Sequence, residues 1–360
     1  MALHFHPLRV RSVRPETDEA VVVSFDVPTD LADTFRFTHG QHLTLRNTIE
    51  GSDERRSYSI CAGIDDGELR VGVRKVPGGR FSTWINEALK AGDTIQVMAP
   101  EGRFFVPLEP RATRHYLGIA GGSGITPILS IMKTVLAAEP KARFTLIYGN
   151  RKLRSTMFTE ELEDLKNRYL SRLTMHMVFS QESTDLPLHN GRLDRAKIGE
   201  FLGRLVDPTQ LDHVFVCGPH GVNDEAEAAL LGAGVAGERI HIERFGIPDA
   251  AGAAARPVSA PLPGDAPDAK ITIIRDGLRS EIDFHADQGN VLDAAAAAGL
   301  EVPFSCRSGV CCTCRAKLLE GEVRMERNFA LEKHEVAAGF ILTCQAHPLT
   351  ERVVISFDER

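Results

Sequence analysis

Three cysteines in one short stretch and a fourth further along are the side chains best suited to chemistry in this chain. Cys306, Cys311 and Cys314 have the spacing C-x4-C-x2-C, and Cys344 follows at a distance. Four thiolates in this pattern are typical of a [2Fe–2S] cluster, because their negative charge offsets that of two irons. The small residues between them let backbone amides approach the sulfurs. The spacing therefore predicts a one-electron centre held by these four cysteines.

Two other uses of four cysteines compete with this interpretation. A structural zinc site usually takes two C-x2-C pairs. A disulfide framework suits a small secreted domain, and the start of this chain, Met1 to His6, does not read as a signal peptide. Cys312 lies inside the loop but outside the x4/x2 register, so we expect it not to be a ligand.

Size and composition place the chain among ordinary soluble proteins. Its 360 residues suffice for two or three domains, with 43% hydrophobic and 25% charged residues. A net charge of −7 argues against nucleic acid as a partner. No apolar segment approaches the ~20 residues that span a bilayer, so we expect no membrane association. Thiolate ligands survive in a reducing compartment, which predicts a cytoplasmic protein.

A break in composition separates the cysteine loop from the rest of the chain. Residues 246–268 are rich in Pro, Ala and Gly and are expected to form a semi-rigid linker. Beyond it, segment 269–360 predicts a small α+β domain. Its expected elements are strands Lys270–Arg275 and Arg279–Phe284 around an Asp276-Gly277 turn, a helix Val291–Ala298 and a strand Gly339–Leu342.

Segment 112–245 predicts an α/β domain with a parallel sheet. A strand, Tyr116–Ala120, runs into the glycine turn Gly121–Pro127 and a helix, Ile128–Ala138. Such a turn places amides and a helix dipole against a pyrophosphate, although it is not the G-x-G-x-x-G pattern. Further strands are expected at Arg143–Tyr148, Leu173–Val178 and His213–Val216, the last ending at Cys217-Gly218-Pro219.

Segment 1–108 predicts a small antiparallel β-barrel. Strands are expected at Ala20–Phe25, His42–Leu45, Arg56–Ile60, Leu69–Val76 and Thr94–Met98. The strand Arg56-Ser57-Tyr58-Ser59 offers a charge, a ring and a hydroxyl, a set that suits a flavin. Alternation puts Arg56 and Tyr58 on one face and the two serines on the other.

Together these segments resemble the ferredoxin–NADP reductase superfamily with a ferredoxin fused at the C-terminus. The resemblance implies a multidomain fold: an antiparallel β-barrel flavin domain, an α/β parallel-sheet nicotinamide domain and an α+β, β-grasp ferredoxin domain. It implies FAD rather than FMN. The residues implied to hold flavin and nicotinamide nucleotide are Arg56, Tyr58, Ser59, Gly78, Gly79, Ser82, Thr83, Gly121, Gly122, Gly124, Thr126, Pro127, Arg151, Ser180, Cys217, Gly218 and Pro219.

The same resemblance implies catalytic roles for four of the chain's residues. Ser59 would contact flavin N5, Cys217 would contact the nicotinamide, and Glu243 and Phe245 match the family's E-x-[FY] ending. The aromatic ring of Phe245 is expected to shield the flavin where the nicotinamide must enter. A hydride would pass from the nicotinamide to the flavin, and single electrons would pass from the flavin to the cluster.

Basic residues favour NADPH as the donor, with NADH left open. Arg151, Lys152 and Arg154 follow the second parallel strand, and Ser180-Gln181 follow the third, where a 2′-phosphate could bind. The alternative is that these basic side chains form an ordinary solvated loop.

Within the superfamily the chain resembles the reductase components of ring-1,2-phenylacetyl-CoA epoxidases. The resemblance rests on Phe5–Leu8, Gly40–Leu45, Thr145–Arg151, Ile240–Phe245 and Ala337–Phe340. It implies an oxygenase partner of the di-iron type. Reductases of phenol or toluene oxygenases share several of these motifs and remain an alternative. The other two alternatives are a reductase that acts directly on a small molecule and a redox protein without an oxygenase partner.

Overall fold

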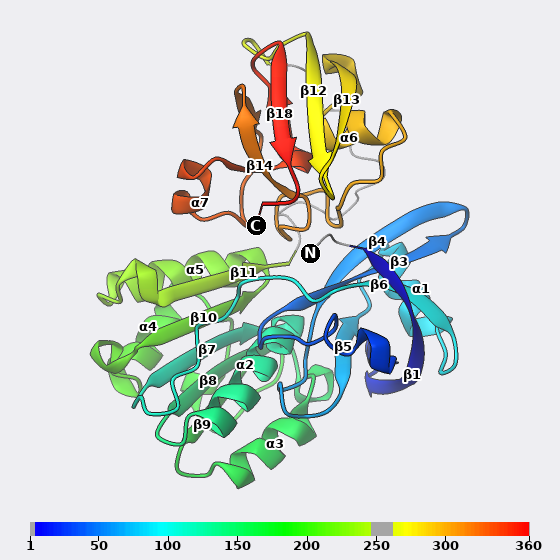
Figure 1. The fold of residues 1–360 in the computed structure, drawn as a ribbon. Helices are drawn as coiled ribbons and strands as arrows, with labels where there is room; N and C mark the ends of the chain where they lie inside the picture. Colours follow the sequence, from blue (N-terminus) through cyan, green and yellow to red (C-terminus); the bar gives the residue numbers. More distant parts are fainter. Residues whose placement is uncertain (1–3, 246–261, 360) are drawn as a thin grey trace. The chain divides into compact units, whose positions relative to one another are not determined.

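The computed structural model describes residues 4–245 and 262–359, so most of the expected linker lies outside the described residues. The chain divides into two compact units. One contains residues 6–54 and 58–245, and the other contains the described residues 262–359 with the short segments 4–5 and 55–57. Figure 1 shows the elements of both. The expected domain limits at 1–108, 112–245 and 269–360 stay a prediction.

The N-terminal part of the first unit is an antiparallel sheet, here called the barrel domain. Its strand order is β4-β3-β6-β1-β2-β5. Valine and other apolar residues fill its interior, which explains why short alternating runs form strands here. The strands are β1 (Phe5–Thr17), β2 (Ala20–Asp26), β3 (His42–Ile49), β4 (Ser52–Ser59), β5 (Leu69–Arg74) and β6 (Thr94–Met98), with helix α1 (Arg80–Glu87) between the last two.

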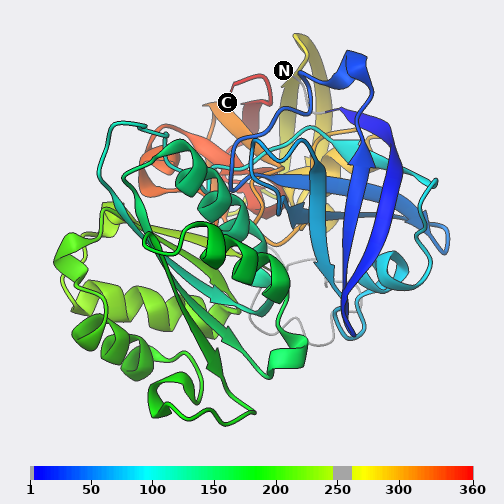
Figure 2. The same cartoon turned by 90° about the horizontal axis from the view of Figure 1, so that it is seen from below.

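The rest of the first unit is the parallel-sheet domain, with strand order β11-β10-β7-β8-β9. Its elements are β7 (His115–Gly121), α2 (Ile125–Ala138), β8 (Arg143–Asn150), α3 (Thr159–Arg168), β9 (Leu173–Phe179), α4 (Arg195–Arg204), β10 (His213–Gly218), α5 (His220–Gly232) and β11 (Ile240–Arg244). Helices α2 and α3 cover one face of the sheet and helices α4 and α5 cover the other, as Figure 2 shows. Every parallel strand expected from the sequence is present, and helix α2 begins three residues before its expected start.

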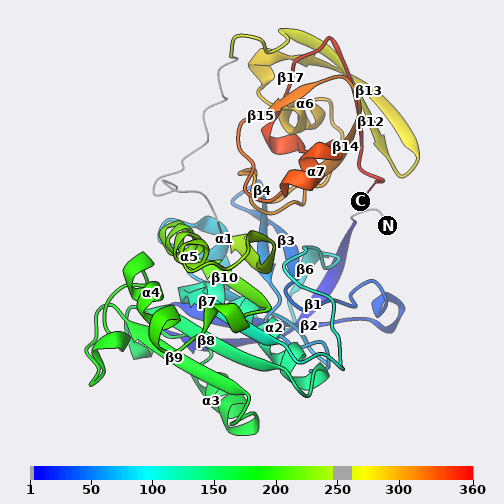
Figure 3. The same cartoon turned by 90° about the vertical axis from the view of Figure 1, so that its left-hand side faces the viewer.

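The C-terminal unit is a mixed sheet with strand order β13-β12-β18-β14-β16 and a helix packed against it. The hairpin of β12 (Asp268–Arg275) and β13 (Leu278–His285) turns at Asp276 and Gly277. Their φ values are 54° and 73°, the left-handed pair that a two-residue hairpin turn requires. Helix α6 (Val291–Ala297) packs Val291 and Leu292 into the core with Ile271. Figure 3 shows α6 with the strands of this unit.

The bounds of this unit agree with the expected hairpin, helix and strand. Its remaining elements are β14 (Arg315–Glu320), β15 (Val323–Met325), α7 (Lys333–Ala337), β16 (Phe340–Leu342), β17 (Ala346–Pro348) and β18 (Arg352–Ser356). Among the helices of residues 4–245 and 262–359, none is long and apolar enough to cross a membrane.

Candidate functional site

The carboxyl ends of strands β7 and β10 meet in a contact made of glycine backbone. A Cβ atom on Gly218 would lie 3.1 Å from the Cα of Gly121, and a Cβ on Gly124 would lie 2.0 Å from the carbonyl oxygen of Cys217. Only glycine permits such an approach. The two strands flank the point where the strand order reverses, and ligands of open α/β sheets bind at this point. The short 3-10 turn Gly122–Gly124 leads into helix α2 here, so the positive end of the helix dipole lies at this edge, where it favours a phosphate.

Three of the four expected catalytic side chains lie together next to this edge. The Ser59 hydroxyl, from the end of β4, donates a hydrogen bond of 3.0 Å to Glu243 Oε2 on β11. Cys217 is the register partner of Glu243 in the neighbouring strand and is fully buried. The fourth, Phe245, directly follows β11 and is 38% exposed.

Burial determines the protonation states of Glu243 and Cys217. Desolvation raises the pKa of Glu243 from 4.5 to about 7, and the hydrogen bond from Ser59 opposes the rise. Part of Glu243 nevertheless remains accessible to solvent. Desolvation, reinforced by the charge of Glu243, raises the pKa of Cys217 well above its ordinary value, so this thiol is neutral. The site thus offers a neutral thiol, a hydroxyl and a carboxyl group that titrates near neutrality.

The expected flavin motif lies on β4 and the turn before α1. Tyr58 stacks with Phe81 at 6.2 Å between ring centroids, and the Arg56 side chain is exposed. Gly78 has φ of 73°, and Gly79 is the N-cap of α1. Ser82 and Thr83 occupy the first turn of this helix, where backbone amides can meet a pyrophosphate. The exposed arginine, the half-buried ring and the helix N-terminus fit the phosphate and ring system of a flavin nucleotide.

A pocket of about 190 Å³ lies where both domains of the first unit contribute. It is lined by Thr17, Asp18, Glu19, Arg74, Arg151, Lys152, Arg154, Ser155 and Gln181. Arg151 and Gln181 are therefore brought together as expected, and the amide of Gln181 donates to the carbonyl of Arg151. Ser180 is exposed and lies outside the pocket lining.

The thiols of the cysteine loop meet in two pairs. Cys306 contacts Cys311, and Cys314 contacts Cys344. In the part of the chain that the structure describes, no three His, Cys, Asp or Glu side chains gather to hold a single ion. Two pairs of thiols match a cluster that needs two ligands on each of two irons.

Amides surround these sulfurs. The Ser308 amide donates to Cys306 Sγ at 3.3 Å, and the Gln345 side-chain amide donates to Cys344 Sγ at the same distance. Arg307 and Cys312 have left-handed φ values of 53° and 55°, which turn the loop around the sulfurs. Donors aimed at sulfur stabilise the charge of a thiolate-bound cluster, so the residues of the loop fit a [2Fe–2S] group.

The Cys312 thiol has a partner outside the two pairs. It donates to the carbonyl of Ala330 at 3.3 Å.

Sequence reasoning missed three residues of these sites. Arg74 approaches the glycine turn, since its Nη1 would lie 3.1 Å from a Cβ on Gly122. Asn223 on α5 donates to the Glu243 carbonyl at 3.2 Å, and Gln345 supports Cys344. Arg74 lies within an expected strand and Gln345 adjoins a cysteine, so their positions in the sequence gave a weak signal for both. Nothing in the sequence marked Asn223.

Comparison with protein families matches all three parts of the chain. Residues 7–106 match an oxidoreductase FAD-binding domain, residues 119–227 an oxidoreductase NAD-binding domain, and residues 273–349 a 2Fe-2S iron-sulfur cluster binding domain. The cofactors are accordingly FAD, a nicotinamide dinucleotide and a [2Fe–2S] cluster.

Relatives extend over nearly the whole chain. The chain is 44% identical to a component of the 1,2-phenylacetyl-CoA epoxidase of Escherichia coli, over 99% of this chain and 98% of the relative. It is 35% identical to the ferredoxin reductase component of a 3-ketosteroid-9-alpha-monooxygenase of Mycobacterium tuberculosis, over 99% and 97%.

A solved structure shows the same fold from end to end. Phthalate dioxygenase reductase superposes with a TM-score of 0.58 at 23% identity, covering 98% of both chains. The expected fold class is confirmed, and so are the three cofactors. The chain therefore belongs to the ferredoxin–NADP reductase superfamily, among the oxidoreductases with a C-terminal [2Fe–2S] domain that serve as reductase components of multicomponent oxygenases.

Proposed function

We propose that this reductase transfers electrons from NADPH to the oxygenase of a phenylacetyl-CoA epoxidase system, and that this oxygenase is a di-iron enzyme. The main support is the 44% identity to a component of such a system over nearly the full length of both chains. We place the protein in the cytoplasm, where the thiolate ligands of a cluster stay reduced.

The residues of the chain have distinct parts in this function. When bound, the nicotinamide supplies a hydride, and the flavin and cluster turn two electrons into single-electron transfers. With the cofactors bound, Ser59 would donate to Glu243 near the flavin, and the neutral Cys217 thiol would offer an uncharged surface to the nicotinamide. The exposed ring of Phe245 would cover the bound flavin and exclude water before the nicotinamide binds.

The pocket between the two domains favours NADPH over NADH. Four cationic side chains line it, Arg74, Arg151, Lys152 and Arg154, against the carboxylates of Asp18 and Glu19. Glu19 already pairs with Arg74 at 3.1 Å, which leaves three cations against the single carboxylate of Asp18, a net positive charge at the pocket. A 2′-phosphate carries close to two negative charges and accepts charge-assisted hydrogen bonds from such groups.

Substitutions at the pocket test the choice of donor. Arg151→Ala should raise KM for NADPH about 10-fold, because one charge-assisted contact is worth about 1.4 kcal/mol, and should leave KM for NADH unchanged. The matched control is Arg195→Ala, an arginine on α4 that is 66% exposed and pairs with Glu225. Equal use of NADH and NADPH by the unmodified protein would refute the proposal, as would an equal loss for both donors.

Reconstitution tests the partner. The purified reductase, NADPH and phenylacetyl-CoA are combined with the oxygenase of a phenylacetyl-CoA epoxidase, and oxygenated thioester is measured. We expect product that depends on the reductase, and little product when the same reductase is paired with a 3-ketosteroid monooxygenase and its steroid. Product only in the steroid reaction would reassign the partner.

A further inference from the structure

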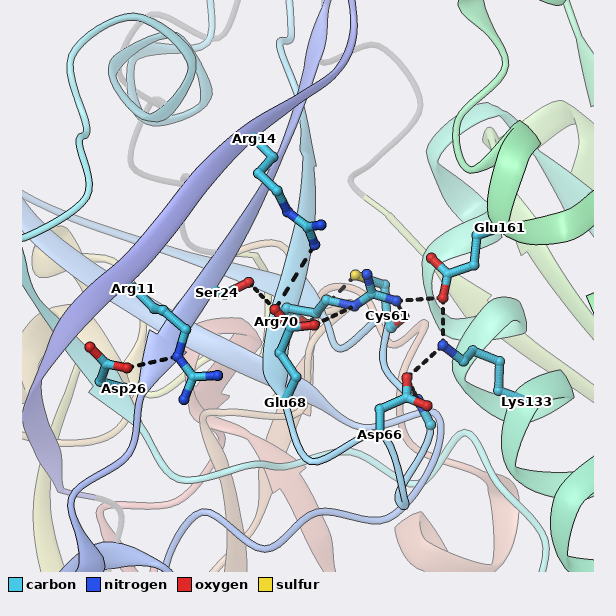
Figure 4. Close-up of polar contacts among 11 residues, drawn as sticks. Arg11, Arg14, Ser24, Asp26, Cys61, Asp66, Glu68, Arg70, Lys133 and Glu161 are labelled. Carbon is cyan, nitrogen blue, oxygen red and sulfur yellow. Dashed lines mark hydrogen bonds and ion pairs between the residues drawn. The ribbon is translucent and has the colours of Figure 1, made fainter. Parts of the chain in front are cut away.

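A partly buried group of charged side chains joins the barrel domain to the parallel-sheet domain. It consists of Arg70, Asp66 and Glu68 from the barrel domain, Lys133 on α2 and Glu161 on α3, and is called here the Arg70 cluster. Figure 4 shows these side chains converging between the β5 region and the two helices. The exposed fraction of each side chain is only 9–26%.

The ion pairs of the Arg70 cluster cross between the two domains. Glu161 Oε1 accepts from Arg70 Nη2 at 2.6 Å and from Lys133 Nζ at 2.5 Å. Lys133 Nζ also lies 2.6 Å from Asp66 Oδ2. One carboxylate oxygen on α3 therefore links a cation of the barrel domain to a cation on α2.

Hydrogen bonds at the same interface tie the backbone of the barrel domain to α2. Ser130 Oγ donates to the carbonyl of Ala62 at 2.6 Å and accepts from the Gly40 amide at 3.4 Å. Thr134 Oγ1 accepts from the Ile64 amide at 3.2 Å. Arg70 Nη2 donates to the carbonyl of Cys61 at 3.2 Å, so the guanidinium reaches both Glu161 and the backbone next to Ala62.

These contacts connect the two halves of the catalytic group. Ala62 lies three residues after Ser59, which belongs to the barrel domain. Helix α2 starts at the glycine turn beside Cys217, and Glu243 lies on the strand next to Cys217. The Ser59–Glu243 hydrogen bond therefore spans the same two domains that the Arg70 cluster joins. A shift of about 1 Å between reacting groups can cost about 100-fold in rate.

We propose that the Arg70 cluster is a positioning element, which holds Ser59 against Glu243 by locking residues 60–70 of the barrel domain onto helices α2 and α3. Arginine suits the part because the two N–H groups of Nη2 have fixed directions in the guanidinium plane, which holds the Glu161 carboxylate and the Cys61 carbonyl in a fixed arrangement that a rotating lysine ammonium does not impose. The inference rests on the roles proposed above for Ser59 and Glu243.

Glu161→Gln and Arg70→Lys test the proposal in the purified reductase with flavin and cluster in place. In each variant the rate constant for flavin reduction by NADPH, measured per bound flavin by stopped-flow absorbance, should fall at least about 10-fold. KM for NADPH should stay within about 3-fold of the unmodified value, because neither side chain lines the nucleotide pocket. Loss of folded protein alone would lower flavin content without changing the rate per flavin.

Hydrogen–deuterium exchange gives a readout that does not depend on activity. The amides of Gly40 and Ile64 donate across the interface, so they should exchange about 10-fold faster in both variants. The matched control is Asp26→Asn, which breaks the half-exposed Arg11–Asp26 pair within the barrel domain, also drawn in Figure 4. The control should match the unmodified protein in both measurements.

A third variant covers the case in which the charged variants do not fold. Ser130→Ala removes the tether to Ala62 without leaving an unpaired charge, and should slow flavin reduction in the same direction. Wild-type rates per flavin together with wild-type exchange at Gly40 and Ile64 would overturn the inference. An unmodified protein that accepts no electrons from NADPH would instead overturn the proposed function.

Discussion

Because the pKa of Glu243 is raised, the pH dependence of the reductase tests the proposed site directly. Its pKa in the folded protein is about 7, against an ordinary 4.5, because protein atoms displace water around the carboxylate. At 1.36 kcal/mol per pKa unit, the ionised form is disfavoured by about 3 kcal/mol. The solvent access that Glu243 retains makes this an upper value. The fold favours the protonated form, so the unfolding free energy should fall as pH rises from 4.5 through 7.

Two substitutions distinguish the contribution of the Glu243 carboxyl group to the pH dependence from that of its hydrogen-bond donor, Ser59. Glu243→Gln removes the titrating group, so the rate of flavin reduction should lose the transition near pH 7. Ser59→Ala removes the hydrogen bond that stabilises the carboxylate, so the transition should move upward. A hydrogen bond to a charged group is worth about 1.5 kcal/mol, which corresponds to about one pH unit.

Stopped-flow reduction at pH values from 5.5 to 8.5 measures the transition, and infrared difference spectra detect the protonated carboxyl group directly. Retention of the transition in Glu243→Gln would refute the assignment. A downward shift in Ser59→Ala would contradict the hydrogen-bond argument even if the assignment survived.

Two further predictions concern the cluster loop and the glycine turn. Cys312→Ser should leave the visible absorbance of the cluster unchanged, because a hydroxyl can also donate to the Ala330 carbonyl. Cys314→Ser should abolish this absorbance. Loss of absorbance in both variants would make Cys312 a ligand. Gly124→Ala should abolish NADPH binding measured by calorimetry, because the new Cβ would lie 2.0 Å from the Cys217 carbonyl oxygen. Gly203→Ala on α4, where a Cβ would meet nothing within 4 Å, should instead bind NADPH normally and gain about 1 kcal/mol of stability.

Elements that depend on the local pattern of residues were predicted well from the sequence. The parallel strands are short apolar runs, Asp276-Gly277 demands a tight hairpin turn, and the cysteine spacing defines a loop around a cluster. Strand β1 was missed because Pro7 and Pro15 interrupt a largely polar run. Strand β11 was missed as a strand because its residues were noted only for their resemblance to a family ending.

The contacts between domains could not be predicted in the same way. Arg70 and Glu161 are 91 positions apart, and their pairing depends on how α3 docks against the barrel domain. Arg74 and Glu19 meet the basic loop 151–154 for the same reason. Charged residues scattered along a sequence have no periodic pattern that would reveal such partners. Ser59 and Glu243 were each expected at the site through resemblance, but the hydrogen bond between them was not predicted.

The glycine contact between β7 and β10 separates what can be redesigned from what cannot. A Cβ on Gly124 or Gly218 would meet backbone atoms at 2.0 Å and 3.1 Å, and one on Gly121 would meet the Pro219 ring at 2.8 Å, so randomising these glycines would yield inactive clones. Arg151 and Arg154, by contrast, stand on an exposed loop that tolerates exchange. A library meant to switch the reductase to a cheaper coenzyme should therefore vary that loop and leave the glycines untouched.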